Sequence, residues 1–139
     1  MKIVLFFIAL AGMLSSCTST PSSPQKTESY KEKVLSLEEL ERLNPADFLT
    51  VDGTYRENFW GDKLNIECKI TNKAKVATYK DAVVQVTYFT KTKTALSKKE
   101  FVVYEILAPN STKTVALKVD NFKNVNSIDL NIVSAKVYN

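Results

Sequence analysis

The sequence contains no histidine and only three glycines among its 139 residues. Without histidine, the chain lacks both the commonest general base and the commonest metal ligand. Three scattered glycines cannot supply a glycine-rich loop that cradles phosphate groups. The fifteen acidic residues are spread along the chain, and no pair of them stands out for acid–base catalysis. We therefore expect a protein that is not an enzyme and has no cofactor and no metal site.

The chain also lacks a strong excess of charge of either sign. Its net charge is +4, which falls to +3 if an N-terminal segment containing Lys2 is cleaved off. This excess is too small to indicate nucleic-acid binding, so we expect no nucleic-acid partner. Hydrophobic residues make up 45% of the sequence, which is typical of a globular chain. The length is sufficient for one domain.

No apolar run is long enough to cross a bilayer. The longest, from Ile3 to Leu14, has about 12 residues, whereas a membrane-spanning helix needs about 20. A run of this length after Lys2 is typical of a secretory signal. It ends in Leu14-Ser15-Ser16-Cys17, which resembles the lipobox of bacterial lipoproteins. We therefore predict a signal peptide over residues 1–16, removed before a lipid-carrying Cys17.

Lipidation of Cys17 predicts a membrane-anchored protein of the bacterial cell envelope. Two or three acyl chains, such as palmitate, anchor a protein stably where a single chain would not. Thr18 follows the cysteine, whereas an aspartate at that position often retains lipoproteins at the inner membrane. This favours the outer membrane over the inner one. The alternative is an ordinary signal peptide followed by an unrelated cysteine.

A polar tether and one short helix precede the main domain. Residues 17–29 include the lipidated cysteine and a proline-containing polar stretch that cannot bury enough apolar surface to fold. Residues 30–47 contain Ser36 and Glu39, spaced as a helix capping box, and Asn44-Pro45 ends the helix. A leucine stripe is expected to pack this helix on the sheet, and its acidic residues are expected to face solvent. The stripe is Leu37, Leu40 and Leu43, and the acidic residues are Glu38, Glu39 and Glu41.

From residue 48 onward, apolar and polar residues alternate with a period of two, which indicates strands. The runs lie near residues 48–58, 64–70, 81–90, 100–107, 115–119 and 128–137. Short strands at near-regular spacing predict an all-β fold over residues 48–139, an immunoglobulin-like antiparallel β-sandwich of six to seven strands. The apolar phase slips by one residue after Ile132, which predicts a β-bulge there.

The stretch from Leu64 to Val119 resembles the FxLYD-like domains, small immunoglobulin-like modules of bacterial envelope proteins. The resemblance is carried by Ile70-Thr71-Asn72, by the strand from Tyr79 to Phe89, and by the turn Leu107-Ala108-Pro109-Asn110-Ser111. Asn110 stands where the family usually has glycine, and asparagine is the next best residue for a left-handed turn. The resemblance supplies no catalytic residues and implies a non-catalytic envelope module.

The strands also carry apolar residues on both faces. Cys68 is expected in the core, where burial makes a thiol inert. In the run at 100–107, Val102, Tyr104 and Ile106 are expected to face the core. A second apolar face then requires cover from the helix, from a second copy or from a partner. Alternatively, a bulge reverses one strand, turning Phe101 and Val103 inward and Tyr104 outward. The second-face residues are Val83, Phe89, Phe101, Val103 and Leu107.

Two groups are candidate contacts for a ligand or a partner. The aromatic residues Tyr55, Phe59 and Trp60 could stack on sugar rings or on a partner protein, although Trp60 is more simply read as a plug for the open end of the sandwich. Lysines bracket a hairpin tip, where they could meet anionic lipid head groups or acidic glycans, or simply remain solvated and block edge pairing of the strands. They are Lys91, Lys93, Lys98 and Lys99. Phe101 is the candidate contact on the second apolar face.

These observations favour a non-catalytic envelope lipoprotein whose β-sandwich mediates protein–protein interaction or assembly. The expected partners are the membrane, through the lipid on Cys17, and a protein or a second copy of the chain. The alternative is a module that binds glycan or peptidoglycan through its surface aromatics. An enzyme is the third and weakest hypothesis.

Overall fold

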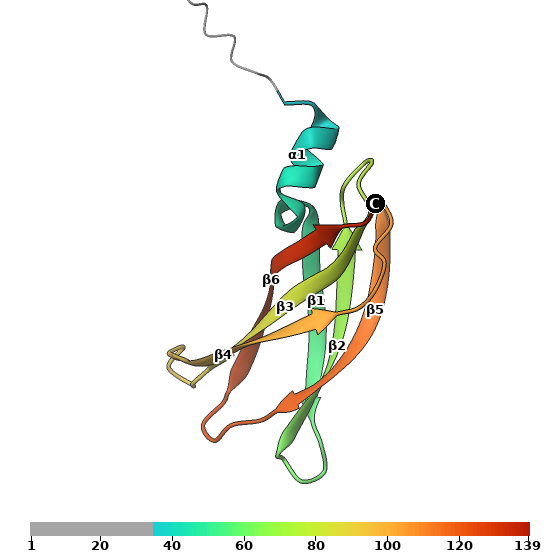
Figure 1. Cartoon of the computed structure of the whole chain (residues 1–139). Helices are drawn as coiled ribbons and strands as arrows, with labels where there is room; N and C mark the ends of the chain where they lie inside the picture. The colour runs from blue at the N-terminus through green and yellow to red at the C-terminus, as the bar shows by residue number, and fades with distance from the viewer. Residues whose placement is uncertain (1–34) are drawn as a thin grey trace, which may run out of the picture. The chain divides into compact units, whose positions relative to one another are not determined.

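A computed structural model describes residues 35–139 of the chain. The predicted signal peptide, Cys17 and the tether lie outside the described residues. A capped helix comes first, a short 3-10 turn follows it, and six strands complete the domain (Figure 1). In chain order the elements are α1 (Leu37–Leu43), η1 (Pro45–Phe48), β1 (Leu49–Glu57), β2 (Lys63–Asn72), β3 (Tyr79–Phe89), β4 (Ala95–Val103), β5 (Ser111–Asp120) and β6 (Ser127–Val137).

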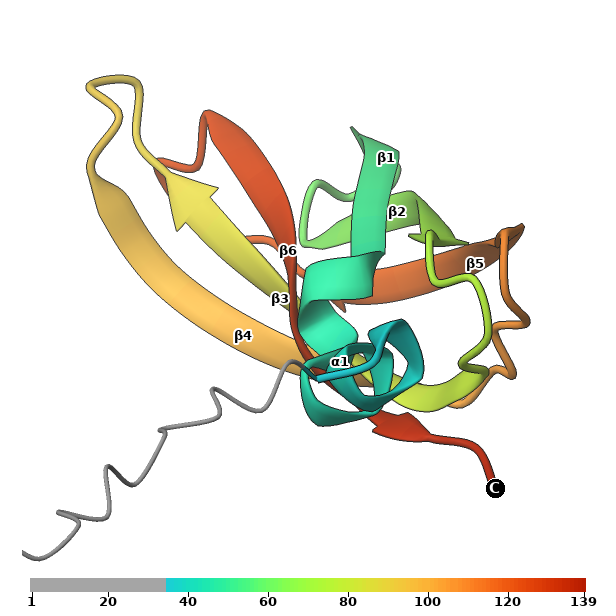
Figure 2. The same ribbon diagram turned by 90° about the horizontal axis from the view of Figure 1, so that it is seen from above.

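The strands form two three-stranded antiparallel sheets. The strand order is β1-β2-β5 in one sheet and β4-β3-β6 in the other. Viewed from above, the two sheets lie as separate layers that approach each other where β1 passes β6 (Figure 2). The predicted all-β sandwich preceded by one short helix is confirmed, with six strands among the described residues.

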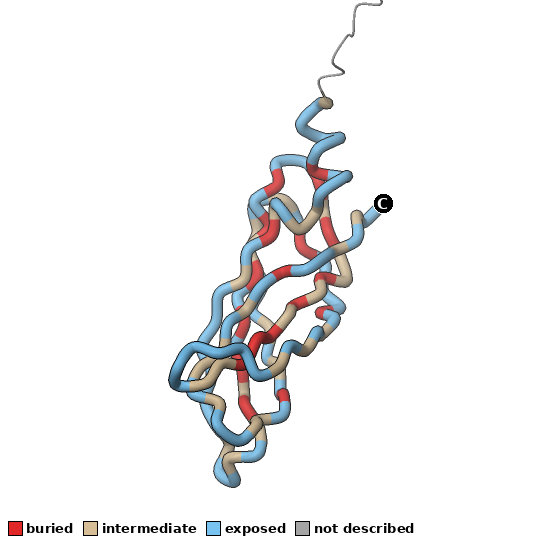
Figure 3. Tube along the Cα trace, turned by 90° about the vertical axis from the view of Figure 1, so that its left-hand side faces the viewer, coloured by how far each residue is buried: buried red, intermediate tan, exposed pale blue. Residues whose placement is uncertain are grey.

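The core lies between the two sheets, and its residues follow the predicted alternation. On β2, Leu64, Ile66, Cys68 and Ile70 are buried, while the residues between them face outward. Burial raises the pKa of the Cys68 thiol to about 11, so this thiol stays protonated and unreactive at neutral pH. The buried positions run along the strands, and most of the loop residues are exposed (Figure 3).

The predicted facing of β4 is wrong, and the reversed alternative is correct. Val84 and Ala82 face the core, and their cross-strand partners on β4 are Phe101 and Val103. Directly paired residues share one face of a sheet, so both partners turn inward. Val102 and Tyr104 are consequently exposed. The strand also ends at Val103, earlier than expected.

Four further residues show how the predicted facing differs from the structure. Ile106 is exposed rather than buried. Leu107 lies beyond β4 and is fully buried, where its backbone bridges to Tyr79. Val83 and Phe89 keep partial exposure on the outer side of β3.

The predicted bulge in β6 is confirmed. Val84 pairs with Ile132, whereas Val83 pairs with Ser134, so Val133 is an extra residue in the ladder. Ile132 is buried and Val133 is exposed. The bulge therefore accounts for the slip in the apolar phase that the sequence contains.

Gly53 lets β1 pass close to the neighbouring strands. A Cβ atom at this position would lie 2.7 Å from the backbone oxygen of Glu67 and 2.7 Å from Cδ1 of Leu130. Real Cβ atoms do not approach other atoms this closely, so any side chain would push β1 away from β2 and β6. The glycine thus permits the two sheets to close along this side.

The leucine stripe of α1 does not pack on the sheet. The predicted capping box is confirmed, because Ser36 Oγ accepts from the Glu39 amide and the Glu39 carboxylate accepts from the Ser36 amide. All three leucines of the stripe, however, are substantially exposed. The buried residue of the helix is Glu41, which was expected to face solvent.

Candidate functional site

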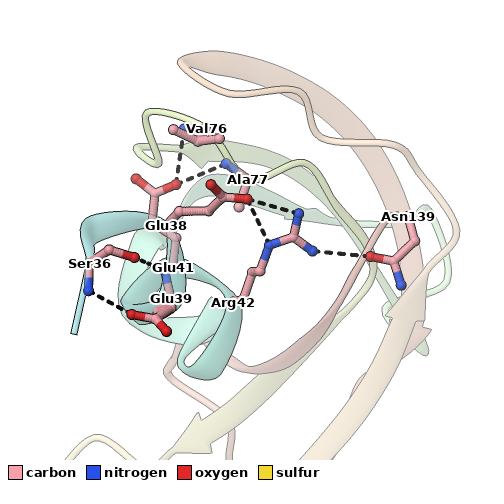
Figure 4. Close-up of polar contacts among 8 residues, drawn as sticks. All are labelled: Ser36, Glu38, Glu39, Glu41, Arg42, Val76, Ala77 and Asn139. Atoms are coloured by element: carbon pink, nitrogen blue, oxygen red, sulfur yellow. Dashed lines mark hydrogen bonds and ion pairs between the residues drawn. The ribbon is translucent and has the colours of Figure 1, made fainter. Parts of the chain in front are cut away.

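The end of the sandwich next to α1 is closed by a buried carboxylate. Glu41 is fully buried, and its two carboxylate oxygens accept three backbone N–H groups from the β2–β3 loop. The donors are the amides of Lys75, Val76 and Ala77, at 2.6, 2.9 and 2.8 Å. Figure 4 shows the last two of these donors. A loop without secondary structure of its own is therefore hydrogen-bonded to the helix.

Burial and hydrogen bonding act on Glu41 in opposite directions. Burial alone would raise the pKa of the carboxyl, but the three backbone donors and the charge of Lys75 together hold the pKa below its usual value of 4.5. The side chain is therefore ionised at neutral pH, which is the form that accepts all three hydrogen bonds. This arrangement stabilises the docked helix and leaves no free group for chemistry.

Two other buried polar residues at this end are also fully bonded. The Asn72 amide donates to the carbonyls of Ala77 and Leu107, and its oxygen accepts from the Ala74 amide. The Tyr79 hydroxyl donates to the Glu41 carbonyl at 2.8 Å. Burial, with a contribution from the Glu41 charge, raises the pKa of Tyr79 to about 12.

An exposed arginine completes the attachment of the helix. Arg42 pairs with Glu38 one turn earlier at 3.1 Å and donates to the side-chain oxygen of Asn139 at 3.2 Å (Figure 4). The helix is thus tied to the last residue of the chain as well as to the β2–β3 loop. These contacts assign the α1 end a structural role.

Three loops gather at the end of the sandwich away from α1, and we call this end the distal end (Figure 1). They are the β1–β2 loop at 58–62, the β3–β4 loop at 90–94 and the β5–β6 loop at 121–126. The β5–β6 loop joins the others, because the Asn121 amide donates to the Asp62 carbonyl and the Asn126 amide to the Phe89 carbonyl.

The distal end carries two unshielded aromatic side chains. Phe59 is 92% exposed and Trp60 is 81% exposed. Their rings meet edge to face with centroids 5.1 Å apart. The expectation that Trp60 plugs the open end is therefore wrong. Phe122 takes that place instead, since its ring packs edge to face on the buried Tyr88 at 4.9 Å.

Two hollows lie at the distal end, one of them beside Trp60. One, of about 450 Å³, lies beside Trp60 and is lined by Glu57, Asp62 and Asn121 among others. The second, of about 340 Å³, lies beside Lys91 and includes Thr90 and Thr92. Both hollows share Asn124 and Val125 of the β5–β6 loop, so they flank the same loop.

The structure brings together some of the predicted contact residues and separates others. Lys91 and Lys93 are exposed in the β3–β4 loop, near the second hollow. Tyr55 is partly exposed on β1, and its hydroxyl donates weakly to the Asn126 carbonyl at 3.4 Å. Phe101 does not join them, because its side chain packs against the core.

The remaining predicted lysines lie along β4 rather than at the tip. Lys98 is exposed, and Lys99 pairs with Asp120 at 3.6 Å while its ammonium lies 5.0 Å above the Phe122 ring. Asp120 also forms an ion pair with Lys63. Lys99 thus ties β4 to the far end of β5, and it is not free for a ligand.

Sequence reasoning missed the β5–β6 loop, which supplies at least half of the lining of each hollow. Most of its residues, such as Asn121, Lys123 and Asn124, are polar, so its sequence resembles that of an ordinary exposed turn. The position of Phe122 among them is the signal that could have placed this loop over the core. Its aromatic ring is the only large apolar side chain in the stretch from 120 to 124.

Two buried oxygen atoms near the distal end have no hydrogen-bond partner among the described residues. They are the Tyr88 hydroxyl and the side-chain oxygen of Asn121. The Asn121 nitrogen faces two acceptors, the Gly61 carbonyl at 3.0 Å and the Glu57 carboxylate at 3.4 Å, which fixes the orientation of the amide. The distal end is therefore less completely bonded than the α1 end.

A second exposed surface lies on the outer side of the sheet β4-β3-β6. Val83 of β3 pairs with Val102 of β4 on one side and with Ser134, next to the bulged Val133, on the other. Val102 and Val133 are both exposed, and Tyr104, just beyond β4, is 81% exposed. We call Val83, Val102, Val133 and Tyr104 the outer apolar face.

Within residues 35–139, no three histidine, cysteine, aspartate or glutamate side chains are grouped so as to hold a metal ion. The same part of the chain contains no helix that is long and apolar enough to span a membrane. Comparison with known proteins finds no matching family model, no matching curated protein and no matching solved structure.

Proposed function

We propose that this chain is a lipid-anchored, non-catalytic protein of the bacterial cell envelope, whose β-sandwich binds a protein partner or assists an assembly. The lipid on Cys17 is the proposed anchor, in the outer membrane rather than the inner one. The outer apolar face is the proposed protein contact. Its support is an apolar row in which Val102 of β4 pairs with Val83 of β3, and the exposed Val133 of the β6 bulge lies next to Ser134, the other partner of Val83.

An exposed apolar row of this kind is unusual for a sheet face that meets only water. Such faces carry polar residues in most antiparallel sandwiches, and contiguous apolar patches commonly mark interaction sites. Tyr104 extends the row with an aromatic side chain of the type enriched at protein interfaces. A partner that covers this face would remove Val102, Val133 and Tyr104 from water together.

Site-specific photo-crosslinking in cells tests this proposal. A photoreactive phenylalanine at position 104 should give one discrete adduct, and Val102→Lys in the same chain should abolish it. The same probe at Lys118, on the outer side of the other sheet, is the control and should give no adduct. An adduct at position 104 that survives Val102→Lys, or no adduct at all, would contradict the proposed protein contact. An adduct of twice the chain mass identifies the partner as a second copy.

The anchor is tested separately. Cys17→Ala should release the protein from membranes into the soluble fraction and should leave the precursor uncleaved. A substituted chain that is still processed and still resists a high-salt wash of the membranes would contradict lipid anchoring.

A second candidate function, glycan binding, is favoured by the exposed indole of Trp60 beside a hollow lined with carboxylate and amide groups. Aromatic rings stack on the apolar faces of sugar rings, and the neighbouring polar groups can accept hydrogen bonds from hydroxyls. This surface is at the distal end and shares no residue with the outer apolar face. The two functions are therefore compatible in one protein.

A further inference from the structure

The two hollows at the distal end differ in charge. The hollow beside Trp60 is lined by the carboxylates of Glu57 and Asp62, together with the exposed ammonium of Lys123. The hollow beside Lys91 is lined by hydroxyl and amide groups and by no carboxylate. Lys93, two residues from Lys91, is exposed in the same loop. A ligand that spans both hollows thus meets acceptors at one end and positive charge at the other.

The carboxylates and the lysines also differ in whether other side chains of the protein already bind them. Asn58 donates to Asp62 at 2.7 Å, and Asn121 donates to Glu57 at 3.4 Å, so both carboxylates already accept a hydrogen bond. By contrast, no ion pair within the described residues involves Lys91 or Lys93. The unneutralised charge of the two hairpin lysines therefore favours an anionic group at the hollow beside Lys91.

The two hollows are close enough to act as one groove. They share Asn124 and Val125, so a ligand lying across the β5–β6 loop would contact both. Each hollow alone is at the lower end of the volume range of small-molecule sites, about 300–1,000 Å³. A ligand of two or more ring-sized units suits this arrangement better than one compact molecule.

We infer that the distal end binds an acidic glycan, with a neutral sugar ring stacked on Trp60 and a carboxylate-bearing sugar beside Lys91. This inference rests on the glycan-binding candidate above and adds the charge and the orientation of the ligand. The Trp60 indole offers a flat apolar surface, and the Phe59 ring meets it edge to face. The Glu57 and Asp62 carboxylates accept hydroxyl donors of the neutral ring, and the ammonium groups of Lys91 and Lys93 attract the acidic one.

Intrinsic fluorescence gives a direct readout, because Trp60 is the only tryptophan in the sequence. The protein is the full lipidated chain in detergent micelles. The probes are hyaluronan tetrasaccharide, which alternates N-acetylglucosamine with glucuronate, and chitotetraose, which contains N-acetylglucosamine without the acidic sugar. We expect both to shift the Trp60 emission, with hyaluronan bound about 10-fold more tightly at low ionic strength. This preference should decrease as salt screens the lysines.

Three variants assign the contacts, with binding measured by calorimetry. Trp60→Ala should abolish binding of both probes. The double substitution Lys91→Gln and Lys93→Gln should remove the preference for hyaluronan and leave chitotetraose binding unchanged. Lys118→Gln removes one positive charge on the outer side of β5, away from the groove, and should change neither affinity.

Each other outcome has a defined meaning. Equal affinities for the two probes would overturn the acidic preference and keep glycan binding. No emission change with either probe at millimolar concentration would overturn both. A shift in emission with phosphatidylglycerol vesicles that neutral phosphatidylcholine vesicles do not produce, and no shift with either oligosaccharide, would identify an anionic membrane surface as the ligand and also overturn the inference. None of these results bears on the outer apolar face.

Discussion

The two ends of the sandwich differ in how far their buried polar side chains are hydrogen-bonded and in how far their aromatic side chains are exposed. At the α1 end, the buried side chains of Glu41, Asn72 and Tyr79 all have hydrogen-bond partners. At the distal end, the buried Tyr88 hydroxyl has no partner within the described residues, and Trp60 is exposed to solvent. The buried polar side chains of one end are therefore all paired within the chain, whereas the other end keeps an unpaired buried hydroxyl and an exposed indole.

This difference separates residues that hold the fold from residues that are free to bind. A buried carboxylate is tolerated only when it is hydrogen-bonded, so Glu41 must keep its three donors for the helix to stay docked. An aromatic side chain in a solvent-exposed loop contributes little to folding, so Phe59 and Trp60 require another explanation. Substitutions at the α1 end should thus change stability, and those at the distal end should change binding.

The largest effect should come from Glu41→Ala. The substitution leaves the amides of Lys75, Val76 and Ala77 without their acceptor in a buried position, so we expect the melting temperature to fall by roughly 10 °C or more. The matched control is Glu38→Ala in the same helix, which removes only an exposed ion pair with Arg42 and should lower it by about 2 °C at most. Thermal unfolding followed by circular dichroism measures both melting temperatures. Equal decreases for Glu41→Ala and Glu38→Ala would refute the contrast between a buried and an exposed glutamate.

The same residue predicts how stability depends on pH. The folded pKa of Glu41 is lower than that of the unfolded chain, so the carboxylate stabilises the fold above the usual pKa of 4.5. This contribution is lost as the pH falls through the lower, folded pKa. The difference in melting temperature between wild type and Glu41→Gln should therefore be largest near neutral pH and should narrow in acid. A difference that is constant down to pH 3 or grows in acid would be incompatible with an ionised, hydrogen-bonded Glu41.

Two buried tyrosines, one nearer each end, allow the two ends to be compared through a smaller effect on stability. Tyr79→Phe removes the hydroxyl that donates to the Glu41 carbonyl, and it should destabilise the protein by about 1 kcal/mol. Tyr88→Phe removes a hydroxyl without a partner among the described residues, so it should be neutral or slightly stabilising, within about 0.5 kcal/mol. Urea unfolding of both variants measures the difference, and a larger loss for Tyr88→Phe would reverse the proposed roles of the two hydroxyls.

The smallest effect on stability should come from Trp60→Ala. The side chain is mostly exposed, and its ring contact is with the equally exposed Phe59, so the change should lie within about 0.5 kcal/mol of wild type. Urea unfolding followed by circular dichroism provides the measurement, since the variant has no tryptophan. A decrease of more than about 2 kcal/mol in the free energy of unfolding would indicate that Trp60 is buried and closes the end of the sandwich.

The regular part of the fold could be predicted because its signals are local. Alternation marked β2 and β3, the slip after Ile132 marked the bulge, and Ser36 with Glu39 marked the start of the helix. The facing of β4 could not be fixed in this way. Its run of apolar residues from Phe101 to Val103 fits either face, and only the pairing with β3 decides between them.

The two ends were less predictable than the strands because their roles depend on contacts between distant segments. Glu41 resembles any glutamate on a helix, and only the β2–β3 loop, more than thirty residues later, makes it a buried acceptor. Likewise, Trp60 is a plausible plug until Phe122, sixty residues later, takes the position over Tyr88. Composition and spacing do not contain this information.

Amide hydrogen exchange followed by NMR tests the contrast between the two ends most directly, because one experiment reports on both. The amides of Lys75, Val76 and Ala77 lie in a loop, yet they donate to Glu41 and should exchange about 100-fold more slowly than those of Phe59 and Trp60. We expect this ratio at neutral pH, and we expect it to disappear in Glu41→Gln. Equal exchange rates in the two loops of the wild-type protein would contradict the closure of the α1 end and the separation of roles that depends on it.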